Sequence, residues 1–211
     1  MYLYIFGSAC RGELDENSDI DMLAIHKKKK KTYHLDGNKI SIYSERKIKE
    51  IWDMGNPFAW HLHYESKLIY SPNDIDFLKN LGTPSAYKEG LTDCIKFYNI
   101  LEKSTYSVRN DKYSLVFDFS TIFLCIRNIS TCYSLHFNKP NFSRDSAILL
   151  GQNSLTIDLE IYNSLKNCRL ANTRGRDIFL TDLEINLVLK ELEYIQVWAK
   201  RLIELIKNDF L

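Results

Sequence analysis

Two closely spaced aspartates near the start of the chain are the residues best suited to chemistry. Asp19 and Asp21 flank Ile20 and lead into the apolar run from Met22 to Ile25, which predicts a β-strand. Side chains alternate between the faces of a strand, so we expect both carboxylates to point the same way and Ile20 and Met22 to point into the core. A divalent cation relieves the repulsion between two such carboxylates. Oxygen ligands of this kind suit Mg²⁺ bound alongside substrate phosphates.

A glycine-serine pair upstream supplies the other half of such a site. The run from Tyr2 to Phe6 is rich in aromatic and apolar residues and predicts a strand that ends at Gly7. Glycine lets the backbone approach a ligand closely, and the turn after it offers N–H groups and the Ser8 hydroxyl to phosphate oxygens. Arg11 is near enough in the chain to add a bidentate contact. The sequence therefore predicts a phosphate-binding turn.

The combination of these motifs is more specific than either alone. The chain has Gly7-Ser8, then Arg11-Gly12, and then Asp19-Ile20-Asp21, with ten residues between Ser8 and Asp19. This pattern resembles the signature of the polymerase-β-type nucleotidyltransferase superfamily, particularly its minimal and aminoglycoside-nucleotidyltransferase-like branches. The resemblance is specific over residues 2–25 and weakens up to about residue 71. Beyond that it concerns only the order of strands before helices.

The resemblance implies transfer of a nucleoside monophosphate from a nucleoside triphosphate, taken as ATP, to a hydroxyl group with release of pyrophosphate. The acceptor would be a small molecule, a protein or an RNA. Asp19 and Asp21 would be catalytic and would hold two Mg²⁺ ions, or Mn²⁺ in their place. The expected nucleotide- and phosphate-binding residues are Gly7, Ser8, Arg11 and Ser18.

One catalytic acid of the polymerase-like members has no counterpart at its expected place. The strand that should supply it, Lys39 to Tyr43, contains no carboxylate. Glu65 is the nearest substitute and the third catalytic candidate, ahead of Asp36 and Glu45. Alternatively the acceptor needs no strong base, or the domain binds nucleotide without transferring it. A non-catalytic nucleotide- or partner-binding module, similar to an antitoxin, is therefore the competing hypothesis.

The elements that must position these residues predict an α+β fold, in which a small mixed-sheet nucleotidyltransferase domain precedes a C-terminal helical bundle. Asp36-Gly37 predicts a hairpin turn, and residues 39–43 and 67–70 predict strands. Ser44 and Asn56-Pro57 predict helix starts, and residues 73–81 a linking helix. We expect an α/β domain over residues 1–82.

Helical spacing of apolar residues dominates the rest of the chain. It predicts helices over residues 87–104, 112–138, 158–169 and 182–207, and so a helical bundle domain over residues 83–211. Arg127 interrupts the most apolar of these helices, and either an ion pair within the bundle or a place at a cleft between the domains would account for it. Two arginine-containing loops, residues 141–146 and 171–176, either face a ligand or are ordinary surface loops.

Composition limits the alternatives. The 211 residues are 45% apolar and carry a net charge of +1, so the chain is globular and has no global attraction for nucleic acid or an anionic membrane. Five scattered cysteines predict reduced thiols rather than disulfides or a zinc site. We expect no membrane segment and a cytoplasmic location, and a homodimer stays open. Because Met1 nearly adjoins the first strand, the chain is either minimal or begins later than a longer form with an additional N-terminal helix.

Overall fold

The computed structural model describes residues 1–13, 20–27, 40–110 and 114–209. Ser18, Asp19 and the predicted hairpin at Asp36-Gly37 lie outside these residues. The chain divides into two compact units, Met1–Lys88 and Glu89–Leu211, which are described separately below. The predicted domain boundary after residue 82 stays a prediction, because compactness alone does not establish independent folding.

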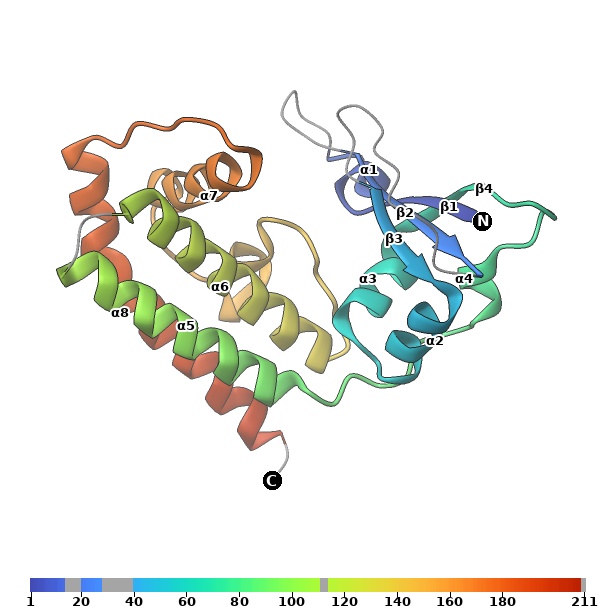
Figure 1. The fold of residues 1–211 in the computed structure, drawn as a ribbon. Helices are drawn as coiled ribbons and strands as arrows, with labels where there is room; N and C mark the ends of the chain where they lie inside the picture. The colour runs from blue at the N-terminus through green and yellow to red at the C-terminus, as the bar shows by residue number, and fades with distance from the viewer. Residues whose placement is uncertain (14–19, 28–39, 111–113, 210–211) are drawn as a thin grey trace. The chain divides into compact units, whose positions relative to one another are not determined.

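The first unit is built on a mixed four-stranded sheet with the strand order β3-β2-β1-β4 (Figure 1). Strand β1 pairs antiparallel with both of its neighbours, whereas β2 and β3 are parallel. The strands are β1 (Tyr2–Phe6), β2 (Asp21–His26), β3 (Ile40–Ser44) and β4 (Ser66–Tyr70). A mixed sheet followed by a helical region confirms the predicted α+β class.

The described part of this unit contains the helices α1 (Ser8–Arg11), α2 (Glu45–Asp53), α3 (Pro57–Glu65) and α4 (Phe77–Asn80). Ser44 and Asn56 cap α2 and α3 as predicted, because their side chains accept backbone N–H groups of the first turn. The predicted linking helix over residues 73–81 is too long. Asp74 has a left-handed φ of 56°, and Asp76 caps a helix that begins only at Phe77.

The core of the first unit lies between the sheet and its helices. Alternate residues of β1, namely Tyr2, Tyr4 and Phe6, are buried against apolar residues of α2 and α3. Leu23, Ala24 and Ile25 of β2 are also buried. The prediction that Ile20 points into the core is wrong, since this side chain is 39% exposed and precedes the first residue of β2.

The segment after α4 is tied to the first unit. Indole N–H groups of Trp52 and Trp60 donate to the carbonyl oxygens of Gly82 and Ser85, at 3.0 and 3.1 Å. The Ser85 N–H donates in turn to the Trp52 carbonyl oxygen, at 3.0 Å. The segment around the predicted domain boundary after residue 82 is therefore fixed to α2 and α3.

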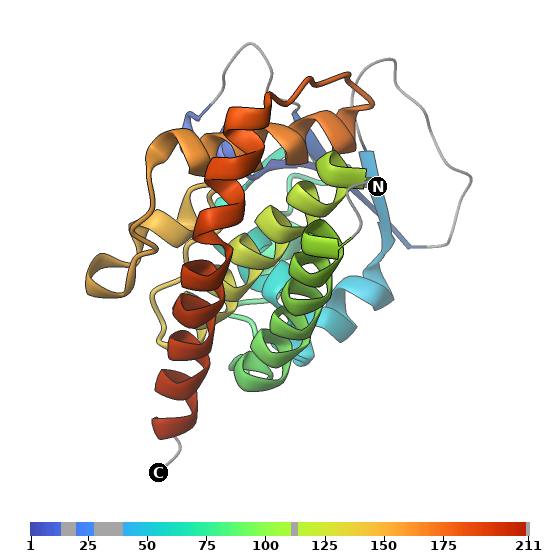
Figure 2. The same ribbon diagram turned by 90° about the vertical axis from the view of Figure 1, so that its left-hand side faces the viewer.

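The second unit is a bundle of long helices, as the sequence predicted. Its members are α5 (Gly90–Asn110), α6 (Leu115–His136), α7 (Leu159–Arg174) and α8 (Asp182–Asn208), with short 3-10 turns at Ser146–Leu149 and Gly151–Asn153. Helix α6 packs against α5, α7 and α8 (Figure 2). It is the central helix of the bundle.

Helix α6 is also the one described helix that is long and apolar enough to cross a membrane by length and composition alone. In its most apolar window 56% is buried inside the unit. Such burial is typical of the core helix of a bundle, so the length and composition of α6 are weak evidence for a membrane span.

Gly55 lies close to the segment after α4, and this closeness gives a test of how the segment packs on α2 and α3. Gly55 has φ +63°, and an added Cβ would lie against the Ser85 carbonyl oxygen and 2.5 Å from that of Ala86. We expect Gly55→Ala to lower the free energy of unfolding in urea by about 1–3 kcal/mol more than the matched variant Gly82→Ala. Gly82 has φ +72° but no atom within 4 Å of its added Cβ, so it isolates backbone strain from the clash. Equal losses in the two variants would contradict this packing.

Candidate functional site

The turn predicted to bind phosphate joins β1 to α1. Gly7 adopts φ 73° and ψ −136°, a conformation that favours glycine, and α1 starts at the next residue, Ser8. The Gly7 carbonyl oxygen accepts the N–H groups of Cys10 and Arg11, at 2.9 and 3.3 Å. Backbone hydrogen bonds therefore shape the turn.

Asp21 and His61 both lie close to Gly7, where its side chain would be. The pairing of Phe6 with Asp21 across β1 and β2 brings this aspartate to the end of β1. A Cβ added to Gly7 would lie 3.4 Å from Asp21 Oδ2 and 3.7 Å from His61 Nε2. The glycine thus keeps a small space beside the carboxylate. The structure brings together Gly7, Ser8 and Asp21, whereas Ser18 and Asp19 are outside the described residues.

Glu65 fixes the end of α3 to this turn. Its carbonyl oxygen accepts the Gly7 N–H at 3.0 Å. Its carboxylate oxygen Oε2 accepts from Arg11 Nη1 and lies 2.9 Å from His61 Nε2. Arg11 Nε also pairs with Glu13 Oε2, at 2.8 Å. The predicted phosphate contact Arg11 is therefore held between two carboxylates, and the predicted third acid Glu65 is bound to two cation-forming side chains.

The charge state of Glu65 follows from these contacts. Burial raises the pKa of Glu65, but the hydrogen bond and charge of His61, together with the charge of Arg11, outweigh it and hold the pKa below the ordinary value of 4.5. An ionised carboxylate only accepts hydrogen bonds, so the proton on His61 Nε2 points toward Glu65. Glu65 is therefore an anchored carboxylate that orients its two partners.

Sequence reasoning missed His61. Its ring packs edge-on against Phe6 and Phe58 of the core, with centroid distances of 5.6 and 6.4 Å. The available signal was the spacing of His61 and Glu65, four residues apart on a predicted helix, which puts both side chains on one face. Its closeness to Gly7 comes from the packing of α3 on the sheet and has no local signal.

The residues at the turn fit a hard cation. Asp21 offers carboxylate oxygens, the ligand type that Mg²⁺ prefers, and the missing Gly7 side chain leaves room beside them. Within residues 1–13, 20–27, 40–110 and 114–209, no group of three or more His, Cys, Asp or Glu side chains is placed to hold a metal. Asp19 is outside these ranges, so the predicted pair of aspartates is not part of that result.

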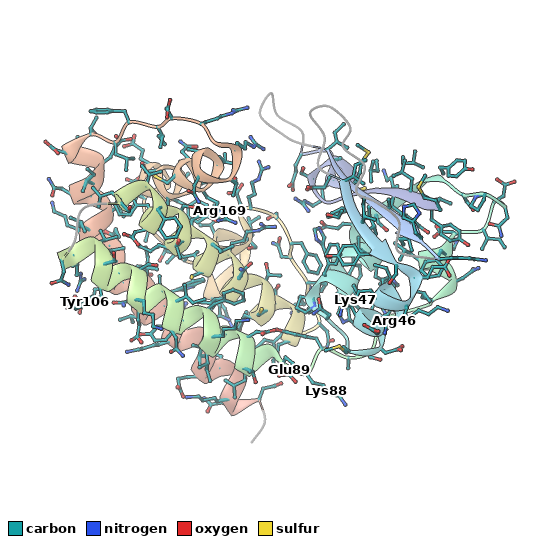
Figure 3. The ribbon with its side chains drawn as sticks, in the orientation of Figure 1. Arg46, Lys47, Lys88, Glu89, Tyr106 and Arg169 are labelled. Atoms are coloured by element: carbon teal, nitrogen blue, oxygen red, sulfur yellow. The ribbon has the colours of Figure 1, made fainter. Side chains whose placement is uncertain are left out.

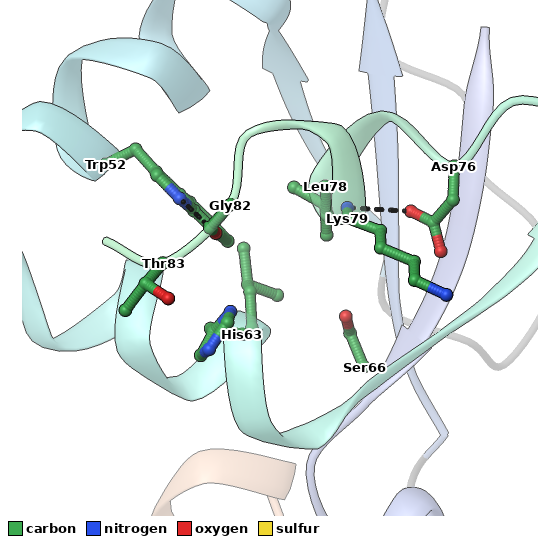
Figure 4. Close-up of a pocket in the computed structure, with 9 residues that line it drawn as sticks. Trp52, His63, Ser66, Asp76, Leu78, Lys79, Gly82 and Thr83 are labelled. Atoms are coloured by element: carbon green, nitrogen blue, oxygen red, sulfur yellow. Dashed lines mark hydrogen bonds between the residues drawn. The ribbon is translucent and has the colours of Figure 1, made fainter.

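A separate pocket of about 290 Å³ lies elsewhere in the first unit (Figure 4). Its wall includes Trp52, His63, Asp76 and Lys79, and none of the predicted site residues that the structure describes. The ring of His63 packs edge-on against Trp52, and burial lowers the pKa of His63. His61 and His63 therefore lie in different surroundings, although both belong to α3.

Comparison with known families identifies the family of the chain that contains this turn. A family model described as the nucleotidyltransferase domain matches residues 2–147, more than half of the chain. The chain belongs to this nucleotidyltransferase family. The match starts at β1 and includes the turn, Asp21 and Glu65, and it confirms the family that the sequence motifs indicated. A search of curated proteins found no match to the nucleotidyltransferase chain.

The anchoring role of Glu65 predicts a pH-dependent contribution to stability. Because the pKa of Glu65 is lowered on folding, its contribution is present above the unfolded pKa and is lost as the pH falls through the folded pKa. We expect Glu65→Gln to lower the free energy of unfolding at pH 7 by about 1–3 kcal/mol. The gap in free energy of unfolding between Glu65→Gln and the original protein should narrow below about pH 4. Urea unfolding at several pH values measures this gap, and Glu193→Gln on the exposed face of α8 is the control. A gap that does not depend on pH would contradict the anchoring role.

Proposed function

We propose that this nucleotidyltransferase moves a nucleoside monophosphate from a nucleoside triphosphate, with ATP as the expected donor, to a hydroxyl group of an acceptor. Membership of the family supports nucleotidyl transfer in general. The observation that carries the proposal is the space at Gly7, where an added Cβ would lie 3.4 Å from Asp21 Oδ2. A phosphate oxygen with its cation would occupy such a place.

Each residue of the turn has a role in this proposal. Asp21, with Asp19 before it in the chain, would hold Mg²⁺ or Mn²⁺. The bound metal would neutralise charge on the phosphates and activate them. Gly7 and Ser8 would offer a closely approaching backbone and a hydroxyl to the phosphate oxygens, with Ser18 as a further contact. Arg11 adds positive charge at the same turn.

We infer that Glu65 positions Arg11 and His61 and does not act as the base. A carboxylate with a lowered pKa is a weak proton acceptor, and its Oε2 already accepts from Arg11 Nη1 and His61 Nε2. Nucleotidyl transfer depends mainly on positioning and charge stabilisation. An acceptor hydroxyl that is well aligned therefore has less need of a strong carboxylate base. This is one of the alternatives that the sequence left open.

The occupied carboxylate of Glu65 also favours a second candidate, a nucleotide- or partner-binding module that does not catalyse transfer. The segment β3 reads Ile-Ser-Ile-Tyr-Ser and offers no carboxylate, and Glu65 is held by Arg11 and His61. A protein without an effective base would bind triphosphate and release no pyrophosphate. The two candidates thus differ in one measurable product.

Pyrophosphate release separates them. The purified protein is incubated with each of the four nucleoside triphosphates and Mg²⁺, with and without a cell extract as a source of acceptors. We expect release that falls by more than about a hundredfold in Asp21→Asn, because loss of a direct metal ligand should exceed the effect of losing an outer-shell partner. Asp53→Asn, at the exposed end of α2, is the matched control and should release pyrophosphate normally.

The other outcomes are equally informative. Release that Asp21→Asn leaves unchanged, in a variant that unfolds like the original protein, would contradict the site. Triphosphate binding that requires Asp21, without any release, would favour the binding module.

A further inference from the structure

The pocket of about 290 Å³ in the first unit combines apolar and polar side chains (Figure 4). Its apolar wall consists of Trp52, Leu62 and Leu78, which are almost fully buried. Ligand sites are commonly apolar, with a few polar groups that fix the orientation of the ligand, and have volumes of about 300–1,000 Å³. This pocket is slightly smaller, so it suits a small molecule. The polar side chains that we consider are His63, Ser66, Asp76 and Lys79.

Asp76 uses one carboxylate oxygen for the fold and keeps the other for a ligand. Its Oδ1 accepts from the hydroxyl of the buried Tyr4 at 2.9 Å and from the Lys79 N–H at 3.1 Å. Among the described residues, no donor contacts Oδ2. The two bonds to Oδ1 hold the carboxylate in place before any ligand arrives. A group that is already ordered loses less entropy on binding.

Lys79 brings the opposite charge to the same wall, one turn after Asp76. Within the described part of the chain, the Lys79 ammonium forms no ion pair, and neither the Ser66 hydroxyl nor the His63 ring nitrogens form a hydrogen bond. Burial lowers the pKa of His63 below its ordinary value of 6.5, so this ring is uncharged at pH 7. The wall therefore offers one negative and one positive group.

These charges select the chemistry of the ligand. A simple anion would leave the Asp76 carboxylate unmatched, and a simple cation would leave the Lys79 ammonium unmatched. A zwitterion matches both, and hydrogen bonds between ionised groups are stronger than those between neutral groups. The apolar wall favours a ligand that also carries an apolar group. A free α-amino acid with an apolar side chain has all three features.

We propose that this pocket binds a free α-amino acid with an apolar side chain. The ammonium group of the ligand pairs with Asp76 and its carboxylate pairs with Lys79. Its side chain packs on the apolar wall, and Ser66 supplies a further hydrogen bond. The inference goes beyond the proposed function and does not depend on it, because no described residue assigned to the triphosphate lines the pocket.

Helix α3 separates this pocket from the turn at Gly7. His61 and His63 are two residues apart, so their side chains point about 200° away from each other around the helix. His61 lies beside Gly7, whereas His63 lines the pocket. The ring signals of these two histidines in NMR therefore report on the two places separately.

A titration without metal or nucleotide tests the proposal. The probes are leucine, isoleucine, valine, methionine and phenylalanine, each added to the protein in EDTA while the histidine ring signals are recorded. The variants His61→Gln and His63→Gln assign the two signals. We expect at least one probe to shift the His63 signal saturably and the His61 signal much less. No saturable shift of His63 with any probe, or larger shifts of His61, would overturn the proposal.

Analogues of the tightest-binding probe test the two charges one at a time. The amide lacks the carboxylate, and the N-acetyl form lacks the ammonium group. We expect each analogue to bind at least about tenfold more weakly than the free amino acid. Equal affinity of the free amino acid and either analogue would contradict the proposed pairing.

Variants connect each charge to its partner. Asp76→Asn should remove the preference for the free amino acid over the N-acetyl form, and Lys79→Gln should remove the preference over the amide. Asparagine still caps α4 and accepts from Tyr4, so the first variant should fold. Retention of both preferences in both variants would overturn the assignment.

Matched controls come from exposed residues of α2. Asp53→Asn removes a carboxylate, and Lys47→Gln removes an ammonium group (Figure 3). Both controls should keep the two preferences. A control that loses a preference as fully as the corresponding pocket variant would mean that general surface charge, and not the pocket, governs binding.

Two further arms separate this inference from the proposed function. Asp21→Asn should bind the amino acid normally, even where it abolishes pyrophosphate release. Excess ATP in EDTA should not displace the amino acid from the original protein. Displacement that returns the His63 signal to its unbound position would mean that the pocket holds part of the nucleotide, and it would overturn the amino-acid assignment.

Discussion

The candidate site depends on the attachment of Glu65 to the turn at Gly7. The Gly7 N–H donates to the Glu65 carbonyl oxygen at 3.0 Å, while the carboxylate of the same residue holds Arg11 and His61. A four-residue helix such as α1 has little stability of its own, so its geometry must come from tertiary contacts. Glu65 thus couples the end of α3 to the end of β1. The carboxylate keeps two positive or proton-bearing groups beside the place where a triphosphate would bring negative charge.

Much of this fold could be predicted from the sequence, because its signals are local. Capping residues such as Ser44 and Asn56 mark helix starts, and helical spacing marks the long helices described in the second unit. Two details of the first unit were predicted wrongly. The linking helix shrinks to α4 because Asp74 takes a left-handed conformation, and Ile20 is exposed because it precedes β2. The parallel pairing of β2 with β3 also depends on long-range contacts that no short motif encodes.

The sequence likewise predicted some residues of the candidate site and missed others. Gly7, Ser8 and Asp21 carry a motif with fixed spacing, so the sequence indicated them and the family match includes them. His61 carries no such motif, and its place beside Gly7 follows from the packing of α3 on the sheet. Burial of arginines is likewise invisible in a sequence. Arg109 and Arg169 are the same residue type in helices of the second unit, but Arg109 is exposed and Arg169 is half-buried.

The most direct test of the central claim is to locate the bound metal-nucleotide by the paramagnetic effect of Mn²⁺ on histidine ring signals in NMR. Manganese substitutes for Mg²⁺ at oxygen-rich sites and broadens nearby protons strongly. The account predicts that Mn²⁺ with ATP broadens the ring signals of His61, beside Gly7 and Asp21, much more than those of His63, which lines the other pocket. The effect should disappear in Asp21→Asn. Broadening of His63 in preference to His61, or bound Mn²⁺ and ATP that leave His61 sharp, would contradict the account.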